Sequence, residues 1–253
     1  MADEMLLNVS AVSHRFGGLQ VLRGVNFDVP ATSLTGLIGP NGAGKSTLFN
    51  IIGGFLLPQQ GTVRFDACDV TRESVLARSR AGLVRTFQTP KVFSRLSVRE
   101  NLMLGCYRHL ASGATGNMLR LRRSRVEMEF MHAQATDAAQ RFGLREVLDR
   151  AAGTVPAGMQ RMVELARACI SRPRLLMLDE PSSGLNTAEI AGLRETLARL
   201  NREGMTILLV SHDMSLVEAA SRVHVLCFGS IIASGNMAQI KQDERVRQAY
   251  LGV

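Results

Sequence analysis

Short runs of apolar residues in the two halves of the chain predict β-strands of two kinds. Residues 5–12 (MLLNVSAV) and 21–29 (VLRGVNFDV) are rich in β-forming residues, and the second run alternates apolar and polar positions. Both are predicted to belong to an antiparallel sheet. Three later runs, at residues 174–179, 205–210 and 223–228, are short and continuously apolar, which is typical of parallel strands buried on both faces. The pattern therefore predicts an α/β core with an antiparallel N-terminal part.

The middle of the chain has a mainly helical pattern. Between about residues 96 and 157, Arg, Glu, Met, Ala and Leu predominate, and ASGATGN at residues 111–117 predicts a flexible loop. The sequence contains no internal repeat and no low-complexity segment. We expect a single domain over residues 1–253, in which a helical subdomain (96–157) interrupts the α/β core (1–95 and 158–253).

The composition is that of a globular protein with an excess of positive charge. The 253 residues are 46% hydrophobic and 21% charged, which allows a full core and excludes a disordered or fibrous chain. A formal net charge of +8 favours polyanions: nucleic acid, anionic lipid or nucleotide phosphates. A basic run, LRLRRSR at residues 119–125, contributes to this charge. Such runs are usually solvated faces, and the alternative is contact with the anionic inner leaflet or with a partner.

Neither the cysteines nor the apolar segments suggest a secreted or membrane-spanning chain. The four cysteines are far apart and form no C-x-x-C pair, so we expect reduced, mostly buried thiols rather than a zinc site or disulfides. The N-terminus lacks the basic and apolar regions of a signal peptide. No apolar run approaches the roughly 20 residues that a spanning helix needs. The longest uncharged candidate, residues 223–240, has the pattern of strand, turn, strand and helix.

One motif predicts a phosphate-binding loop. GPNGAGKST at residues 39–47 matches G-x-x-x-x-G-K-[ST] between a predicted strand and a predicted helix, the context that the motif requires. Its glycines let backbone N–H groups surround phosphate oxygens at a helix N-terminus. Lys45 can reach the β- and γ-phosphates, and the Ser46 hydroxyl can bind Mg²⁺. The predicted nucleotide-binding residues are Gly39, Pro40, Asn41, Gly42, Ala43, Gly44, Lys45, Ser46 and Thr47.

A second motif places two acids after an apolar strand. In LLMLDEP, Asp179 and Glu180 stand at the C-terminal end of the strand, outside which ligands bind in α/β sheets. Asp179 is placed to hold Mg²⁺, and Glu180 to polarise an attacking water as general base. Hydrolysis needs only a positioned water, so this pair favours ATP hydrolysis over transfer to an acceptor. A nucleotide kinase is the weakest alternative.

With these motifs in this order, the whole chain resembles the ATP-binding subunits of ABC transporters. The resemblance implies that Gln88, in VRTFQ, approaches Mg²⁺ and the attacking water, and that His212, in LLVSHD, lies near the γ-phosphate. It implies that Phe16, in SHRFGG, stacks on adenine; the alternative is a buried phenylalanine at a strand end. SSGLN at residues 182–186 matches the loop after the acid pair. The implied fold is a phosphate-loop ABC ATPase core, with a mixed sheet, an antiparallel N-terminal part and a helical insert.

The signature of the family, Leu-Ser-Gly-Gly-Gln, corresponds here to VPAGMQ at residues 155–160. Gly158 is retained, whereas Pro156 replaces the serine, and Ala157 and Met159 replace the first glycine and the glutamine. Gln160 ends the stretch. Two such subunits are expected to pair head to tail and to form two seams. Each seam holds one ATP between the phosphate loop of one subunit and the signature of the other. Since proline has neither a hydroxyl nor an N–H group, we hypothesise that the seam using VPAGMQ is the weaker one.

A finer resemblance is to the ATP-binding subunits of branched-chain amino-acid importers. It rests on the proline in the signature, GLN after the acid pair, HDM after the strand, the insert near ASGATGN and the ending VRQAYLG. The family form usually has an acidic residue where Ser211 stands, and Tyr and Gln where Ala157 and Met159 stand. The resemblance implies ATP and Mg²⁺ as cofactors, and a peripheral site on the cytoplasmic face of the inner membrane. The implied partners are two transmembrane permease subunits, a sister ATPase and, indirectly, a periplasmic binding protein.

Three alternatives to this interpretation remain. The cargo could be urea or a short amide, or the chain could belong to an exporter. A soluble ABC ATPase acting on RNA or DNA would suit the basic charge, but the chain has one cassette and no sustained heptads. We therefore expect no nucleic-acid partner.

Overall fold

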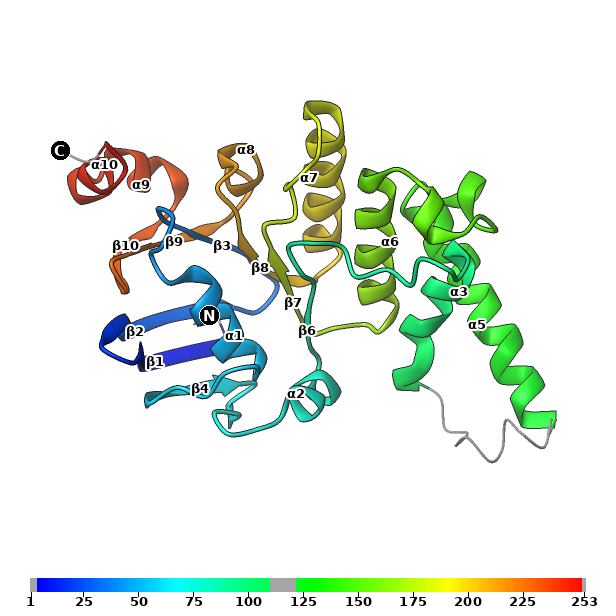
Figure 1. The fold of residues 1–253 in the computed structure, drawn as a ribbon, viewed down its shortest axis with the longest axis horizontal. Helices are drawn as coiled ribbons and strands as arrows, with labels where there is room; N and C mark the ends of the chain where they lie inside the picture. Colours follow the sequence, from blue (N-terminus) through cyan, green and yellow to red (C-terminus); the bar gives the residue numbers. More distant parts are fainter. Residues whose placement is uncertain (1–3, 110–121, 252–253) are drawn as a thin grey trace. The chain divides into compact units, whose positions relative to one another are not determined.

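The structure is a computed structural model that describes residues 4–109 and 122–251 (Figure 1). The chain forms two units, each considered by itself. The first unit comprises Met1–Gln88, Arg174–Ser183 and Ile190–Val253, and the second comprises Thr89–Pro173 and Gly184–Glu189.

The N-terminal strands of the first unit form an antiparallel sheet of order β2-β1-β4-β5. Its strands are β1 (Met5–Phe16), β2 (Leu19–Pro30), β4 (Gln60–Phe65) and β5 (Cys68–Asp69). From Leu22 to the end of β2 the apolar positions are buried and most polar ones are exposed, as one-sided burial of a strand requires. The predicted antiparallel N-terminal part is confirmed.

A second sheet in this unit has the order β10-β9-β3-β8-β7-β6 and is parallel except for β10. Its strands are β3 (Leu34–Ile38), β6 (Leu83–Arg85), β7 (Leu175–Asp179), β8 (Thr206–Val210), β9 (Arg222–Cys227) and β10 (Ser230–Gly235). Every residue of β3, β7 and β8 is buried, which explains the mainly apolar sequences of these strands. The predicted buried parallel strands are confirmed, whereas the three-residue β6 was not predicted.

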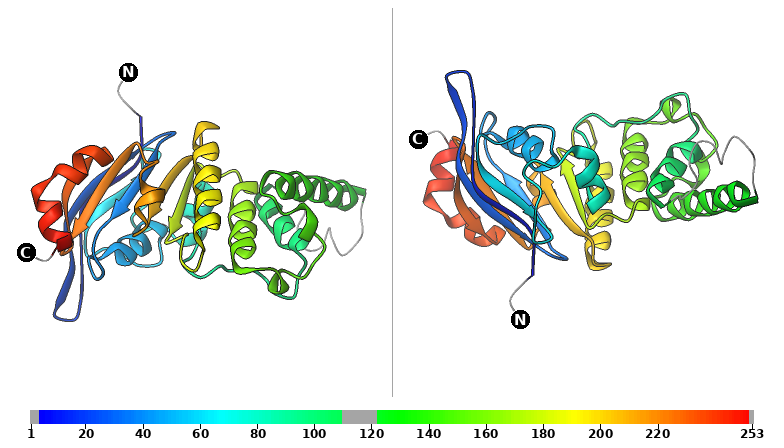
Figure 2. Two further views of the ribbon diagram at one scale, coloured as in Figure 1. Left: turned by 90° about the horizontal axis from the view of Figure 1, so that it is seen from above. Right: turned by 90° about the horizontal axis from the view of Figure 1, so that it is seen from below.

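Helix α1 joins the two sheets through the core of the first unit. Phe49, Ile51 and Ile52 are fully buried in one cluster with residues of both sheets, including Leu7 of β1 and Met177 of β7. Because it is buried on several sides, α1 gives the loop that precedes it a fixed position. The helices of this unit are α1 (Lys45–Gly53), α2 (Val75–Ala81), most of α7 (Thr187–Arg202), α8 (Met214–Val217), α9 (Met237–Gln242) and α10 (Glu244–Leu251). Figure 2 shows α9 and α10 beside β10, which both contact.

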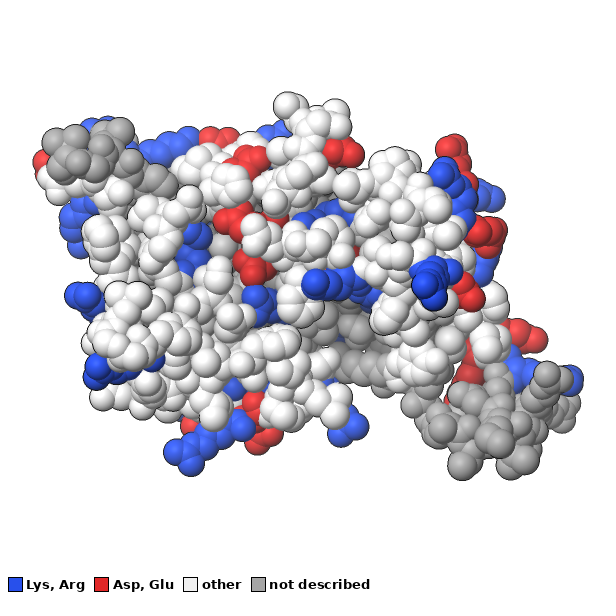
Figure 3. Space-filling view, in the orientation of Figure 1, with Lys and Arg blue, Asp and Glu red and all other residues white. Residues whose placement is uncertain are grey.

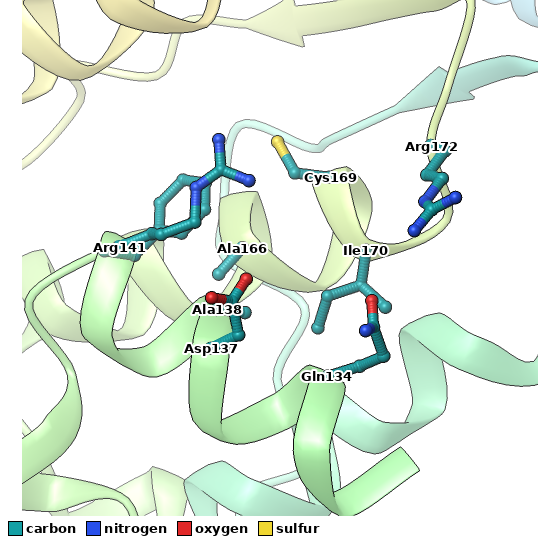
Figure 4. A pocket seen from close by; sticks show the side chains of 9 residues that line it. Gln134, Asp137, Ala138, Arg141, Ala166, Cys169, Ile170 and Arg172 are labelled. Atoms are coloured by element: carbon teal, nitrogen blue, oxygen red, sulfur yellow. The ribbon is translucent and has the colours of Figure 1, made fainter. Parts of the chain in front are cut away.

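The second unit is helical. It contains α3 (Val98–Met103), α5 (Arg122–Arg141), α6 (Ala157–Ile170) and the short 3₁₀ helices η1 (Leu104–His109), η2 (Arg145–Val147) and η3 (Ala152–Thr154). Helix α3 packs on both α5 and α6. A capping box between Ser97 and Glu100 starts α3. A cavity of about 180 Å³, lined by residues of α5, α6 and the turn after α6, lies in this unit (Figure 4).

The second unit extends beyond the predicted limits of 96 and 157 on both sides. The Lys91 N–H donates to Glu164 Oε1 of α6 at 3.0 Å, and the Arg167 guanidinium of α6 donates to the Lys91 carbonyl. These bonds join the segment before residue 96 to α6, and α6 itself packs on α3 and α5 of the predicted insert. This is a tertiary effect that no local sequence pattern signals.

Two features expected from sequence fall wholly or partly outside the described residues. The loop predicted at 111–117 lies outside them, and so do residues 119–121 of the basic run. In the part of the chain that is described, no helix is long and apolar enough to cross a membrane. On the face seen in Figure 3, Lys and Arg are interspersed with Asp and Glu.

Candidate nucleotide-binding site

The phosphate loop connects β3 to α1, and two of its glycines leave no room for a side chain. A Cβ on Gly39, at φ +155°, would lie 2.0 Å from the carbonyl oxygen of Leu226. Gly44, the N-cap of α1, has φ +104°, and its Cβ would lie 2.9 Å from the Val21 carbonyl oxygen. Both positions require glycine on steric grounds as well as conformational ones. The backbone between them can thus follow the tight path of a phosphate cradle.

Lys45, the first residue of α1, turns its ammonium group back into this loop. Its Nζ donates to the carbonyl oxygens of Gly39 at 2.7 Å and Pro40 at 2.9 Å. Burial lowers the pKa of Lys45, and the charges of Glu180 and Asp179 act in the opposite direction. The first turn of α1 contains no acidic residue, so the cation and the helix N-terminus together favour a bound anion.

A pocket of about 390 Å³ brings together residues from five separate segments of the first unit. Gln88, Glu180 and His212 face the loop that ends in Lys45. Its lining consists of Val21, Asn41, Gly42, Ala43, Gly44, Lys45, Ser46, Thr47, Gln88, Glu180 and His212. Of the residues predicted for the nucleotide site, Phe16, Gly39, Pro40 and Asp179 lie outside this lining. None of the predicted residues lines the cavity of the helical unit.

Phe16 ends β1 and is half-exposed, so it is not a buried strand-end residue. Its ring meets the His14 ring edge to face, with 4.7 Å between centroids. Such an exposed aromatic face suits stacking on a base.

Glu180 and His212, which both line the pocket, contact each other. Glu180 Oε2 lies 2.6 Å from His212 Nδ1 and accepts the backbone N–H of His212 at 3.2 Å. The backbone of Glu180 has φ +46° and donates its N–H to the Val210 carbonyl at 2.9 Å. The carboxylate is therefore fixed by both the side chain and the backbone of His212.

Asp179 lies deeper than Glu180 and is paired with a residue that sequence reasoning missed. Its Oδ2 accepts the Arg85 Nη2–H at 2.7 Å, and both side chains are almost fully buried. Ser211, where the resembled family usually has an acid, is fully buried, and its Oγ accepts the Asp213 N–H at 3.0 Å. Its hydroxyl thus stabilises the turn that carries His212.

The signature residues start helix α6 in the second unit. Pro156 is the N-cap and offers no side-chain acceptor. Gly158 is buried, and a Cβ there would lie 2.1 Å from Oε1 of Glu189. Glu189 in turn exchanges two hydrogen bonds with Asn186, at 2.9 and 3.0 Å. Ala157 and Met159 are exposed, and Gln160 is half-buried and donates from its side chain to the Val155 carbonyl. Their role toward a partner's ATP stays a prediction.

The family model described as ABC transporter matches residues 22–183. The chain belongs to the ABC transporter family. A second model, described as a branched-chain amino acid ATP-binding cassette transporter, matches residues 230–253. As a member of the ABC transporter family, the chain is an ATP hydrolase coupled to transport. It works with permease partners that are embedded in the membrane. Its peripheral association with the membrane follows from those partners.

Relatives of known name cover the cassette from end to end. The high-affinity branched-chain amino acid transport ATP-binding protein BraF of Pseudomonas aeruginosa is 39% identical over 98% of both chains. LivG of Escherichia coli K12, with the same descriptive name, is 38% identical over 99% of both chains. A probable LivG of Methanocaldococcus jannaschii is 31% identical over the full length of each.

Solved structures confirm the fold of the cassette. A nucleotide-free ATP-binding cassette of an ABC transporter has a TM-score of 0.84 at 30% identity and covers 98% of this chain and 100% of its own. Another cassette, in its ADP conformation, has the same TM-score and identity and covers 98% of this chain and 99% of its own. The predicted phosphate-loop ABC ATPase fold is therefore confirmed.

Proposed function

We propose that this chain is the ATPase of a branched-chain amino-acid importer and that its pocket of about 390 Å³ is the nucleotide site. One observation carries the proposal: Glu180, held by His212, lines the same pocket as Lys45 and the phosphate loop. The cargo is supported by the names of the full-length relatives and by the second family model.

In this proposal, the loop and Lys45 bind the phosphates of ATP, while Phe16 offers a face to the adenine. The carbonyl contacts of Lys45 hold its side chain against the loop, so little ordering entropy is lost when a phosphate binds. Glu180 accepts a proton from the attacking water as general base. His212 fixes the orientation of that carboxylate. Gln88, which also lines the pocket, would supply an amide to the metal or the attacking water.

The donor groups near the loop fit Mg²⁺. The Ser46 hydroxyl, the Gln88 amide oxygen and the Asp179 carboxylate are hard oxygen ligands, the type that Mg²⁺ prefers together with substrate phosphates. When bound, the ion would neutralise charge on those phosphates.

We further propose that the cassette works at the cytoplasmic face of the inner membrane with two permease subunits and a sister ATPase, receiving substrate through a periplasmic binding protein. Pro156 favours a sister over a second copy of this chain, because the seam using VPAGMQ lacks a signature hydroxyl. The sister's signature would then complete the seam that contains Lys45 and Glu180.

The decisive experiment measures uptake of radiolabelled leucine in cells whose only copy of this chain carries Glu180→Gln. The control is Glu195→Gln, at an exposed position of α7. Loss of high-affinity uptake in the first variant alone, with the protein still at the membrane, would support the importer and the role of Glu180. Unchanged uptake would exclude branched-chain amino acids as the cargo, and urea and short amides would be tested next. Tight, salt-sensitive RNA or DNA binding would instead favour the soluble alternative.

A further inference from the structure

A buried arginine outside the pocket lining joins two of the site's motifs. Arg85 ends β6, and its Nη2 donates to Asp179 Oδ2 at 2.7 Å. Its Nη1 donates to the Oδ1 of Asn50, on α1, also at 2.7 Å. The Arg85 and Asp179 side chains are only 8% and 9% exposed. Breaking such a pair would leave a buried charge without compensation. Each side chain therefore fixes the position of the other.

Three aromatic rings surround the guanidinium. The Arg85 Cζ lies 5.5 Å from the ring centroids of Phe55 and Phe87 and 5.6 Å from that of Phe49. Phe55 and Phe87 also meet edge to face, with 5.9 Å between centroids. Cation–π contact adds attraction and holds the plane of the guanidinium. The Nη1 and Nη2 groups of Arg85 donate to Asn50 and Asp179, whereas its Nε is buried without a partner.

The position of Arg85 relates this cluster to catalysis. Asn50 is in the helix that follows the phosphate loop, Asp179 is the expected metal ligand, and Phe87 precedes Gln88, which lines the pocket. A planar guanidinium can bridge two acceptors at fixed angles, which an ammonium group cannot do. Since Oδ2 of Asp179 is taken by Arg85, its Oδ1 is the oxygen left for another ligand.

We propose that Arg85 is a positioning residue for the divalent cation: its guanidinium, anchored on Asn50, fixes the Asp179 carboxylate through Oδ2 and leaves Oδ1 available to the metal that would accompany ATP. This inference rests on the proposed nucleotide site. Replacing Arg85 frees the carboxylate to rotate. Groups that orient a metal ligand typically change metal affinity by about 10- to 100-fold, and we expect the lower end of that range here.

The test uses the purified full chain and Mn²⁺ as a spectroscopic probe. Binding of Mn²⁺ to the ATP-loaded protein is measured by electron paramagnetic resonance, and binding of a fluorescent ATP analogue is measured with and without Mg²⁺. We expect Arg85→Gln to weaken Mn²⁺ binding about tenfold while metal-free nucleotide affinity stays within about twofold. Arg85→Lys keeps the positive charge but lacks the planar guanidinium with its two donor nitrogens, so we expect a smaller loss of Mn²⁺ affinity.

Arg78→Gln is the matched control. Arg78 is also a buried arginine of this unit, but its guanidinium donates to backbone carbonyls, including those of Ile51 and Ile52. Its loss should lower thermal stability without a selective effect on Mn²⁺. If Arg85→Gln does not fold, Mn²⁺ binding is compared in Arg85→Lys and Asn50→Ala instead. The second of these leaves the Arg85–Asp179 pair intact.

The proposal is overturned if the variants at Arg85 bind Mn²⁺ as the wild type does and lose only thermal stability, as Arg78→Gln does. Failure of the wild type to bind the ATP analogue would be a different result, because it would overturn the proposed nucleotide site itself.

Discussion

Glu180 and His212, 32 residues apart in sequence, share one short contact: Glu180 Oε2 lies 2.6 Å from Nδ1 of the imidazole. A carboxylate can only accept a hydrogen bond, so Nδ1 carries the proton in this contact. The His212 side chain is 70% exposed, whereas that of Glu180 is 15% exposed. The imidazole thus fixes the carboxylate while its Nε2 edge stays accessible to a ligand in the pocket.

Glu180→Gln should separate nucleotide binding from hydrolysis. Glutamine keeps the size of the side chain but cannot take a proton from water, and loss of a general base typically lowers the rate about 10²- to 10⁴-fold. We expect unchanged affinity for ATP and a fall in phosphate release of at least about 100-fold. Glu195→Gln controls for the loss of one surface charge, and near-normal turnover in Glu180→Gln would contradict the assigned base.

His212→Ala tests whether the histidine acts through Glu180. The substitution leaves the carboxylate with only the backbone N–H of residue 212 as a partner from this turn. Turnover should fall more than about tenfold with little change in the KM for ATP, the signature of an interaction used in the transition state. His132→Ala, at an exposed position of α5, is the matched control. A raised KM with normal turnover would show that His212 serves binding instead.

Sequence could predict those parts of the site that are local. The phosphate loop is one contiguous segment, and its spacing alone predicts its form. Glu180 is predicted from its place after an apolar strand and His212 from the family resemblance, whereas their direct contact is visible only in the fold. Arg85 was missed because its partner Asp179 is 94 positions away. A basic residue among the apolar positions of LVRTF was the one available signal, and it did not indicate a buried pair.

The limits of the helical second unit could likewise not be predicted from local sequence patterns. Helix α6 has a helical pattern of its own, and nothing local in that pattern indicates whether it packs with the core or with the insert. Its contacts with α3 and α5, and those of Glu164 and Arg167 with Lys91, place it with the insert. Long-range packing of this kind cannot be inferred from hydrophobic periodicity.

Gly39→Ala should abolish nucleotide binding. The added Cβ would meet the Leu226 carbonyl oxygen at 2.0 Å, and the backbone φ of +155° is strained for any other residue. We expect no measurable binding of ATP and a loss of stability of about 2 kcal/mol or more. Gly192→Ala is the matched control, because nothing lies within 4 Å of its Cβ in helix α7. It should stabilise the protein by about 0.5–1 kcal/mol. Normal ATP binding by Gly39→Ala would contradict the close approach of the loop to β9.

Pro156→Ser tests the hypothesis of unequal seams. A serine N-cap can accept N–H groups of the first turn of α6 and stabilises helices by about 1 kcal/mol relative to a residue without an acceptor. It also restores a hydroxyl to the signature. In the assembled transporter we expect a higher ATPase rate from the seam that uses VPAGMQ, measured with the other seam inactivated by Glu180→Gln in this chain. An unchanged rate, with the melting temperature raised, would mean that the serine acts only as a cap.

His224 predicts an acid-sensitive core. Its Nε2 donates to the Asp28 carbonyl at 3.1 Å, so its Nδ1 accepts the Ser234 hydroxyl at 2.7 Å, and the neutral ring is satisfied. Burial lowers the pKa of His224 from 6.5 to about 4. The unfolded chain therefore takes up this proton first as pH falls, and stability is lost between pH 6.5 and about 4. Between pH 7 and 4.5 the loss due to this group should be roughly 2.5 kcal/mol.

The measurement is urea unfolding of the wild type and of His224→Gln at both pH values. Glutamine cannot titrate, so the variant should lose less stability on acidification than the wild type, by roughly 2.5 kcal/mol. Carboxylates contribute equally to both proteins and cancel in this difference. His132→Gln, which removes an exposed histidine, should behave as the wild type does. Equal acid sensitivity in all three proteins would mean that His224 does not resist protonation in the fold.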